Sequence, residues 1–159
     1  PAIIKARKNS ETLYEEKVQK LYDLMVWVAV AVALPTTLFA DWVILILYGA
    51  DFQEAADVLK MYIWAGVFVS LGVASSKWLI AENLERYSFY STLLGAILNI
   101  VCNFYLIPIY GIRGAALATL ISYGTAAYLS MALFEKTRNN FWIATRALNP
   151  YAVYLRATR

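Results

Sequence analysis

One stretch of this chain, residues 99–119, holds an apolar run, a proline, two glycines and a second apolar run in close succession. Pro108 has no backbone N–H and is expected to end the helix before it. Gly111 and Gly114 permit a sharp reversal, and the alanines that follow restart a helix with small side chains. The only charge in the stretch is Arg113. Two apolar runs joined by so short a turn predict a transmembrane hairpin.

The composition supports a membrane location. Of the 159 residues, 61% are hydrophobic and 16% are charged, whereas soluble domains carry about 25% charged residues. The net charge of +3 does not indicate a nucleic-acid partner, because the basic residues gather in segments expected to face the cytoplasm. The chain has no histidine for general-base chemistry or metal binding, and the single Cys102 excludes an internal disulfide. We expect no cofactor and no catalytic activity.

The alternation of apolar and polar segments predicts an all-α integral membrane protein with about four transmembrane helices and one short interfacial helix. About 18–20 residues cross a hydrocarbon core of about 30 Å. Residues 41–49 are too short for a crossing and carry aromatic side chains, so they are expected to lie at the far interface. The membrane part is expected over residues 23–135, with helices at about 23–40, 58–80, 87–107 and 114–134.

Both ends of the chain are polar and basic. Residues 1–22 carry apolar side chains at helical spacing and predict a cytoplasmic amphipathic connector; an anionic-lipid or calmodulin-type target is the alternative. Residues 136–159 predict a basic cytoplasmic tail. Its expected interface anchors are Phe141, Trp142, Ile143 and Leu148. Because Lys and Arg set the orientation of membrane proteins, both ends are expected in the cytoplasm, which agrees with an even number of spans.

Two features interrupt the expected helices. Residues 35–37, Pro-Thr-Thr, break the first span and act either as a hinge or as a simple tilt, and the threonine hydroxyls can satisfy the carbonyl that Pro35 leaves free. Asp51, Glu54 and Asp57 form an acidic cluster that complements the start of the second transmembrane helix; acid–base or cation chemistry is the alternative.

Six polar residues inside or beside the expected spans are candidates for a substrate path. Lys77 either snorkels to the interface or lines a polar cavity that attracts an anion. Asn99 and Asn103 lie four apart, on one helical face, and either bond a neighbouring helix or line a hydrated path. Arg113 is expected at the outer mouth. Hydrogen-bonding support is expected from Ser75 and Ser76.

The hairpin at residues 99–123 resembles the late hairpin of polysaccharide-repeat-unit flippases, the O-antigen translocases of the multidrug/oligosaccharidyl-lipid/polysaccharide (MOP) exporter superfamily. Further segments are similar to this family in the same order: an earlier helix end, an outer-face segment and a following helix end. These are Pro1-Ala-Ile-Ile4, Ile46-Leu-Tyr-Gly-Ala-Asp-Phe-Gln-Glu-Ala-Ala56 and Ser75-Ser-Lys-Trp-Leu-Ile80.

The resemblance implies two helical lobes around a central cavity, with this chain as most of the second lobe and a C-terminal piece of a longer protein. It also implies a function: moving an undecaprenyl-diphosphate-linked oligosaccharide across the bacterial inner membrane by alternating access, for O-antigen, capsule or exopolysaccharide synthesis. The implied partners are this lipid-linked substrate, membrane lipids, the N-terminal lobe and the polysaccharide polymerase machinery.

Three alternatives remain. Another exporter of the superfamily would carry either drugs, with coupling carboxylates inside its spans, or a lipid-linked peptidoglycan precursor. A membrane glycosyl- or acyltransferase would need a carboxylate or histidine set in one loop, and only the acidic cluster at residues 51–57 comes close. A bare helical assembly unit is the third.

Overall fold

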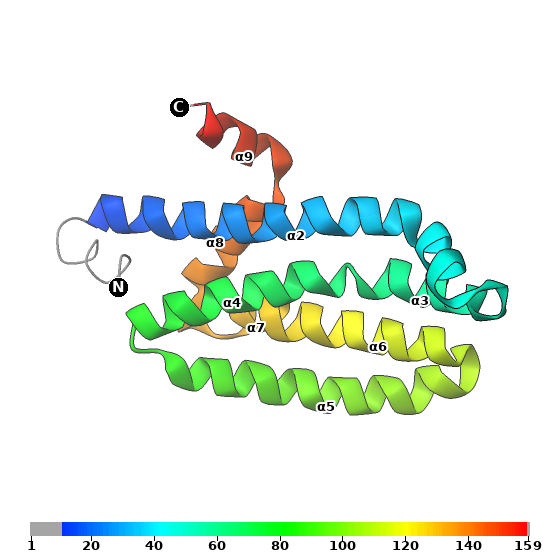
Figure 1. Ribbon diagram of the computed structural model, residues 1–159. Coiled ribbons are helices and arrows are strands. Elements are labelled where there is room, and N and C mark those ends of the chain that lie inside the picture. The colour runs from blue at the N-terminus through cyan, green and yellow to red at the C-terminus, as the bar shows by residue number, and fades with distance from the viewer. Residues whose placement is uncertain (1–10, 159) are drawn as a thin grey trace.

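The computed structural model describes residues 11–158, and every regular element among them is a helix. Four stretches of these residues are long and apolar enough to cross a membrane, which confirms the expected fold class. They lie side by side in a bundle, with α2 along one edge and α5 along the other (Figure 1). The four stretches are Glu11–Tyr48, Ala50–Ala81, Glu85–Tyr110 and Ile112–Leu133.

The first stretch is one continuous helix, α2 (Glu11–Tyr48). Its 38 residues extend about 57 Å at 1.5 Å per residue, well beyond a hydrocarbon core of about 30 Å. The described part of the connector and the segment expected as a separate interfacial helix are therefore turns of this same helix. Residues 1–10 of the connector lie outside the described residues.

Pro35 does not break α2, contrary to expectation. The missing N–H of Pro35 frees the carbonyl of Ala31, yet the neighbouring hydroxyls bond other carbonyls: Thr36 donates to Val32 O and Thr37 to Ala33 O, each at 2.8 Å. The helix thus tolerates one missing backbone bond, and neither threonine replaces it.

The second stretch comprises η1 (Ala50–Phe52), α3 (Gln53–Tyr62) and α4 (Ala65–Ala81). Gly49, with φ 87°, turns the chain out of α2. The single helix expected over 58–80 is interrupted at residues 63–64, where the Trp64 indole N–H donates to Thr37 Oγ1 at 3.1 Å. The break therefore lies where the second stretch contacts another helix, α2.

The expected hairpin is present and is tighter than predicted. Helix α5 (Glu85–Tyr110) and helix α6 (Ile112–Gly124) are separated by Gly111 alone, which has φ 56°. Pro108 lies inside the last turn of α5 and does not end the helix. It removes only the bond to Phe104 O, and the helix stops at Tyr110, so little further structure depends on that bond.

Two irregular segments follow α6. A π-helical segment, η2 (Thr125–Leu129), leads into α7 (Ser130–Leu133), where one regular helix was expected to residue 134. The tail then forms η3 (Glu135–Thr137), α8 (Arg138–Leu148) and α9 (Pro150–Ala157).

The tail helix α8 packs back onto the bundle, which corrects the expectation of interface anchoring. Ile143 belongs to the buried core, and Phe141 and Leu148 pack against that core. Only Trp142, 54% exposed, remains available to an interface. The apolar face of α8 covers α2 and α4 instead, because this buries it against protein.

Candidate functional site

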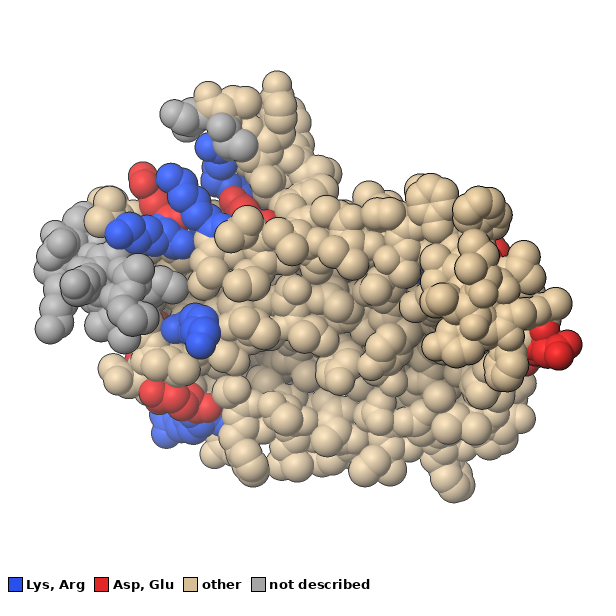
Figure 2. All heavy atoms as spheres, in the orientation of Figure 1, with Lys and Arg blue, Asp and Glu red and all other residues tan. Residues whose placement is uncertain are grey.

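A cavity of about 610 Å³ lies between α4, α5 and the α6–η2 segment. In the space-filling view the surface is hollowed between α4 and α5 (Figure 2). Its lining residues are Tyr62, Phe68, Val69, Gly72, Val73, Ser75, Ser76, Leu79, Ser88, Ser91, Thr92, Gly95, Ala96, Asn99, Thr119, Ser122, Tyr123, Ala126 and Ala127.

Close helix contacts on two sides explain why the hollow exists. Gly95 of α5 lies against η2, where an added Cβ would stand 2.6 Å from Ala126 Cβ. Gly72 of α4 lies against the same segment, where an added Cβ would stand 3.5 Å from Ala127 Cβ. Helices α4 and α5 are therefore both packed against the α6–η2 segment, which forms the base of the cavity. Above this base, α4 and α5 remain apart.

The cavity wall mixes polar and apolar side chains. Hydroxyl, amide and phenol groups lie among Gly, Ala, Val, Leu and Phe side chains, and most of the wall surface is apolar. Among the residues that the structure describes, no Lys, Arg, Asp or Glu lines it. Charged side chains gather at the ends of the bundle, most of them at the end that holds the N-terminal part of α2 and the tail (Figure 2).

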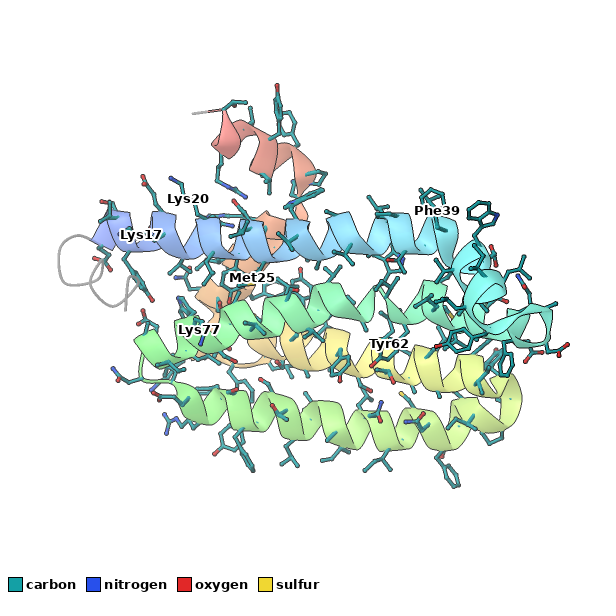
Figure 3. The ribbon with its side chains drawn as sticks, viewed as in Figure 1. Lys17, Lys20, Met25, Phe39, Tyr62 and Lys77 are labelled. Atoms are coloured by element: carbon teal, nitrogen blue, oxygen red, sulfur yellow. The ribbon has the colours of Figure 1, made fainter. Side chains whose placement is uncertain are left out.

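Three of the six predicted path residues line this cavity: Ser75, Ser76 and Asn99. Asn103, Lys77 and Arg113 are absent from its lining. Lys77 is exposed near the end of α4, and Figure 3 places it toward the opposite end of the α3–α4 segment from Tyr62. This position fits the snorkelling alternative.

Asn99 and Asn103 share one face of α5, as predicted, and they bond each other. The Asn103 Nδ2 group donates to Asn99 Oδ1 at 2.9 Å. Among the described residues, neither amide shows the bond to a neighbouring helix that was one of the two alternatives; Asn99 lies on the cavity wall and Asn103 is outside its lining.

The Ser75 hydroxyl takes part in a hydrogen bond with the tail helix α8. Asn140 of α8, fully buried, donates from Nδ2 to Ser75 Oγ at 2.7 Å. The Tyr22 hydroxyl of α2 donates to Asn140 Oδ1. One buried amide thus joins α2, α4 and α8, a link that could not be read from the sequence because its members are 65 and 118 positions apart.

Arg113 lies at the bundle end that holds the α5–α6 turn, in a chain of exposed ion pairs. Its guanidinium contacts Asp57 at 2.6 Å, and Lys60 contacts Asp57 at 3.6 Å and Asp41 at 2.7 Å. These contacts tie α2, α3 and α6 together. Asp57 of the predicted acidic cluster therefore serves ion pairing; within residues 11–158, no group of three His, Cys, Asp or Glu side chains could hold a metal.

Sequence reasoning missed most of the cavity's hydroxyl groups. On α5 the lining positions are 88, 91, 92, 95, 96 and 99, a spacing of three and four that marks one helical face. Ser88, Ser91, Thr92 and Asn99 make that face polar in an otherwise apolar span. The signal was therefore present in the sequence, spread over three turns rather than concentrated in a motif.

Comparisons with known proteins match a family and a curated relative. The family described as "Lipid II flippase MurJ" matches residues 1–155. The chain is 31% identical over 91 residues to the probable low-salt glycan biosynthesis flippase Agl15 of Haloferax volcanii; the match covers 57% of this chain and 19% of that protein. The chain thus spans about a fifth of the length of this curated relative. No solved structure matches.

Proposed function

The chain belongs to the lipid II flippase MurJ family, and from this premise we propose that it is part of a transporter that moves a lipid-linked saccharide across a cell membrane by alternating access. The observation that carries the proposal is the cavity between α4, α5 and α6–η2, which places hydroxyl and amide groups inside a bundle of membrane-spanning helices. Sugars and diphosphates do not cross hydrocarbon unaided, because each desolvated polar group costs free energy. A polar surface inside the membrane lowers that cost.

The substrate that we propose is an oligosaccharide repeat unit on undecaprenyl diphosphate, as used for O-antigen, capsule or exopolysaccharide synthesis. The glycan flippase named among the relatives supports a glycan cargo. A lipid-linked peptidoglycan precursor is the second candidate, and the family description favours it.

The proposed location is a plasma membrane, with both ends of the chain in the cytoplasm. The basic residues at the bundle end that holds the N-terminal part of α2 and the tail support this orientation. The partners are an N-terminal lobe that completes the cavity, membrane lipids and, downstream, a polysaccharide polymerase.

The proposal also holds that the protein transports its substrate without catalysing a reaction on it. A transferase needs acidic or basic groups that face its substrate, and the described cavity wall offers hydroxyls and one amide. A drug/ion antiporter of the same superfamily needs coupling carboxylates inside its spans, and this wall supplies none among the described residues.

The test is transport by the full-length protein in proteoliposomes. Fluorescent lipid-linked oligosaccharide and fluorescent lipid-linked peptidoglycan precursor are followed separately by their exposure to an impermeant glycan-cleaving enzyme. Faster exposure of either lipid than in protein-free liposomes supports the flippase, and the faster of the two identifies the substrate. Equal rates with and without protein, for both lipids, contradict the proposal.

A further inference from the structure

Nine of the described residues on the cavity wall carry a hydroxyl group. Four of them donate to a carbonyl one turn earlier in their own helix. Ser76 bonds Gly72 O, Thr92 bonds Ser88 O, Thr119 bonds Ala115 O and Ser122 bonds Ala118 O, at 2.6–3.0 Å. A hydroxyl has one proton to give and two lone pairs. These four groups therefore present lone pairs to the cavity.

The Asn99 amide complements these acceptors. Its Oδ1 receives the Asn103 N–H at 2.9 Å, so the oxygen is held back toward α5. The Asn99 Nδ2 group is then the amide's donor on the cavity wall. Asn103, which does not line the cavity, acts as a positioning residue for this donor.

A diphosphate and a sugar need different hydrogen-bonding groups on the wall that binds them. A diphosphate is charged and only accepts hydrogen bonds, so it needs cations or several donors. Sugar hydroxyls both donate and accept, so they match a neutral surface rich in acceptors. The nearby cations do not change this balance: Lys60 and Arg113 are paired with Asp41 and Asp57 at the end that holds the α5–α6 turn, and Lys77 is outside the lining.

We propose, on the basis of the function proposed above, that this wall is a subsite for the uncharged glycan of the lipid-linked substrate, with Asn99 as a donor to it, and that the diphosphate is bound elsewhere in the full-length protein. The glycan's hydroxyl protons bond the lone pairs of Ser76, Thr92, Thr119 and Ser122. An oxygen of the same glycan accepts from Asn99.

Two probes separate this proposal from a general anion site. The dissociation constants of undecaprenyl-diphosphate-linked oligosaccharide and of undecaprenyl diphosphate without glycan are measured on the full-length protein. Asn99→Leu removes the donor at similar size, Thr92→Val removes an acceptor, and Asn139→Leu is the matched control on the exposed face of α8. Binding of the glycan-free lipid also reports that each variant is folded.

We expect Asn99→Leu and Thr92→Val to weaken binding of the glycan-bearing lipid about five-fold each, the loss of one neutral hydrogen bond. Binding of the glycan-free lipid should stay unchanged in both, and Asn139→Leu should affect neither. Asn103→Leu should weaken only the glycan-bearing lipid, by a smaller factor.

If Asn99→Leu and Thr92→Val weaken binding of both lipids equally, or of neither lipid, the proposed glycan subsite is overturned. A variant that no longer binds the glycan-free lipid overturns it too, because the wall would then serve the diphosphate or the fold. Failure of the wild-type protein to bind either lipid is a different result, and it contradicts the proposed function itself.

Discussion

Gly114 of α6 lies so close to Leu106 of α5 that a Cβ atom on it would stand 2.2 Å from the Leu106 carbonyl oxygen. The obstacle is backbone rather than a mobile side chain, so it cannot move aside. The single-residue turn at Gly111 forces this approach, because the two helices diverge from one point. The hairpin therefore depends on a glycine at residue 114.

The first prediction follows directly. Gly114→Ala should lower the free energy of unfolding by about 1–3 kcal/mol, the usual cost of overpacking. Gly66→Ala is the matched control, since an added Cβ there meets nothing within 4 Å. Thermal unfolding of the purified protein in detergent measures both; equal stability of the two variants would contradict the close approach.

The second prediction concerns the buried amide of Asn140. Asn140→Leu leaves the Tyr22 and Ser75 hydroxyls buried without this partner, at a cost of about 1–3 kcal/mol per group. The triple variant Tyr22→Phe, Ser75→Ala, Asn140→Leu removes all three polar groups and should recover most of that stability. Asn139→Leu, on the exposed side of the same helix, should change stability little. A triple variant less stable than the single one would show that the three groups do not act together.

The third prediction concerns the ion pairs near the α5–α6 turn. Arg113 and Asp57 are 48% and 40% exposed, and exposed pairs contribute about 0.2–1 kcal/mol. A double-mutant cycle with Arg113→Ala and Asp57→Ala should give a coupling energy in this range that falls as salt rises. A coupling several times larger, or one insensitive to salt, would contradict the exposed character of this pair.

The fourth prediction separates Lys77 from the substrate path. Lys77→Ala should leave transport of the lipid-linked oligosaccharide near the wild-type rate, because the side chain is exposed and outside the cavity lining. Surface polysaccharide in cells that depend on the full-length protein provides the readout, at matched expression. Loss of polymer would restore the sequence-based hypothesis that Lys77 contacts an anionic headgroup.

The sequence predicted the helices well where long apolar runs determine them. Hydrocarbon requires every backbone group to be bonded within its own helix, so the four membrane-spanning stretches follow from hydropathy alone. The small residues of the hairpin also indicated its tight turn. The prediction of a separate interfacial helix at residues 41–49 was wrong, because nothing in the composition of this stretch shows that α2 continues through it to Tyr48.

Local breaks and the site were harder to predict, because distant contacts determine them. The interruption at residues 63–64 lies where Trp64 contacts Thr37, 27 positions away. The packing of α8 depends on Tyr22 and Ser75, which the sequence does not connect with the tail. The two prolines were expected to break or end helices, but Pro35 and Pro108 both lie inside helices. Pro108 is near the end of α5, where only one backbone bond is lost.

The site was predicted in part. Asn99 was recognised because an amide inside an apolar span needs a partner, and that partner is Asn103. The hydroxyl residues around it were not recognised, since serine and threonine occur in membrane helices for packing alone. The cationic character expected of the path, from Lys77 and Arg113, is absent from the described cavity wall.

The most direct test of the account is thiol labelling at Asn99 in the full-length protein. In a Cys102→Ala background, Asn99→Cys and Ile100→Cys are treated in membranes with a water-soluble thiol reagent. Asn99 lies on the cavity wall, whereas Ile100 is 70% exposed on the apolar outer face of α5. We predict that only Asn99→Cys is labelled, and that lipid-linked oligosaccharide slows its labelling. Equal labelling at both positions, or labelling of Asn99→Cys that the oligosaccharide does not slow, would contradict a substrate path through this cavity.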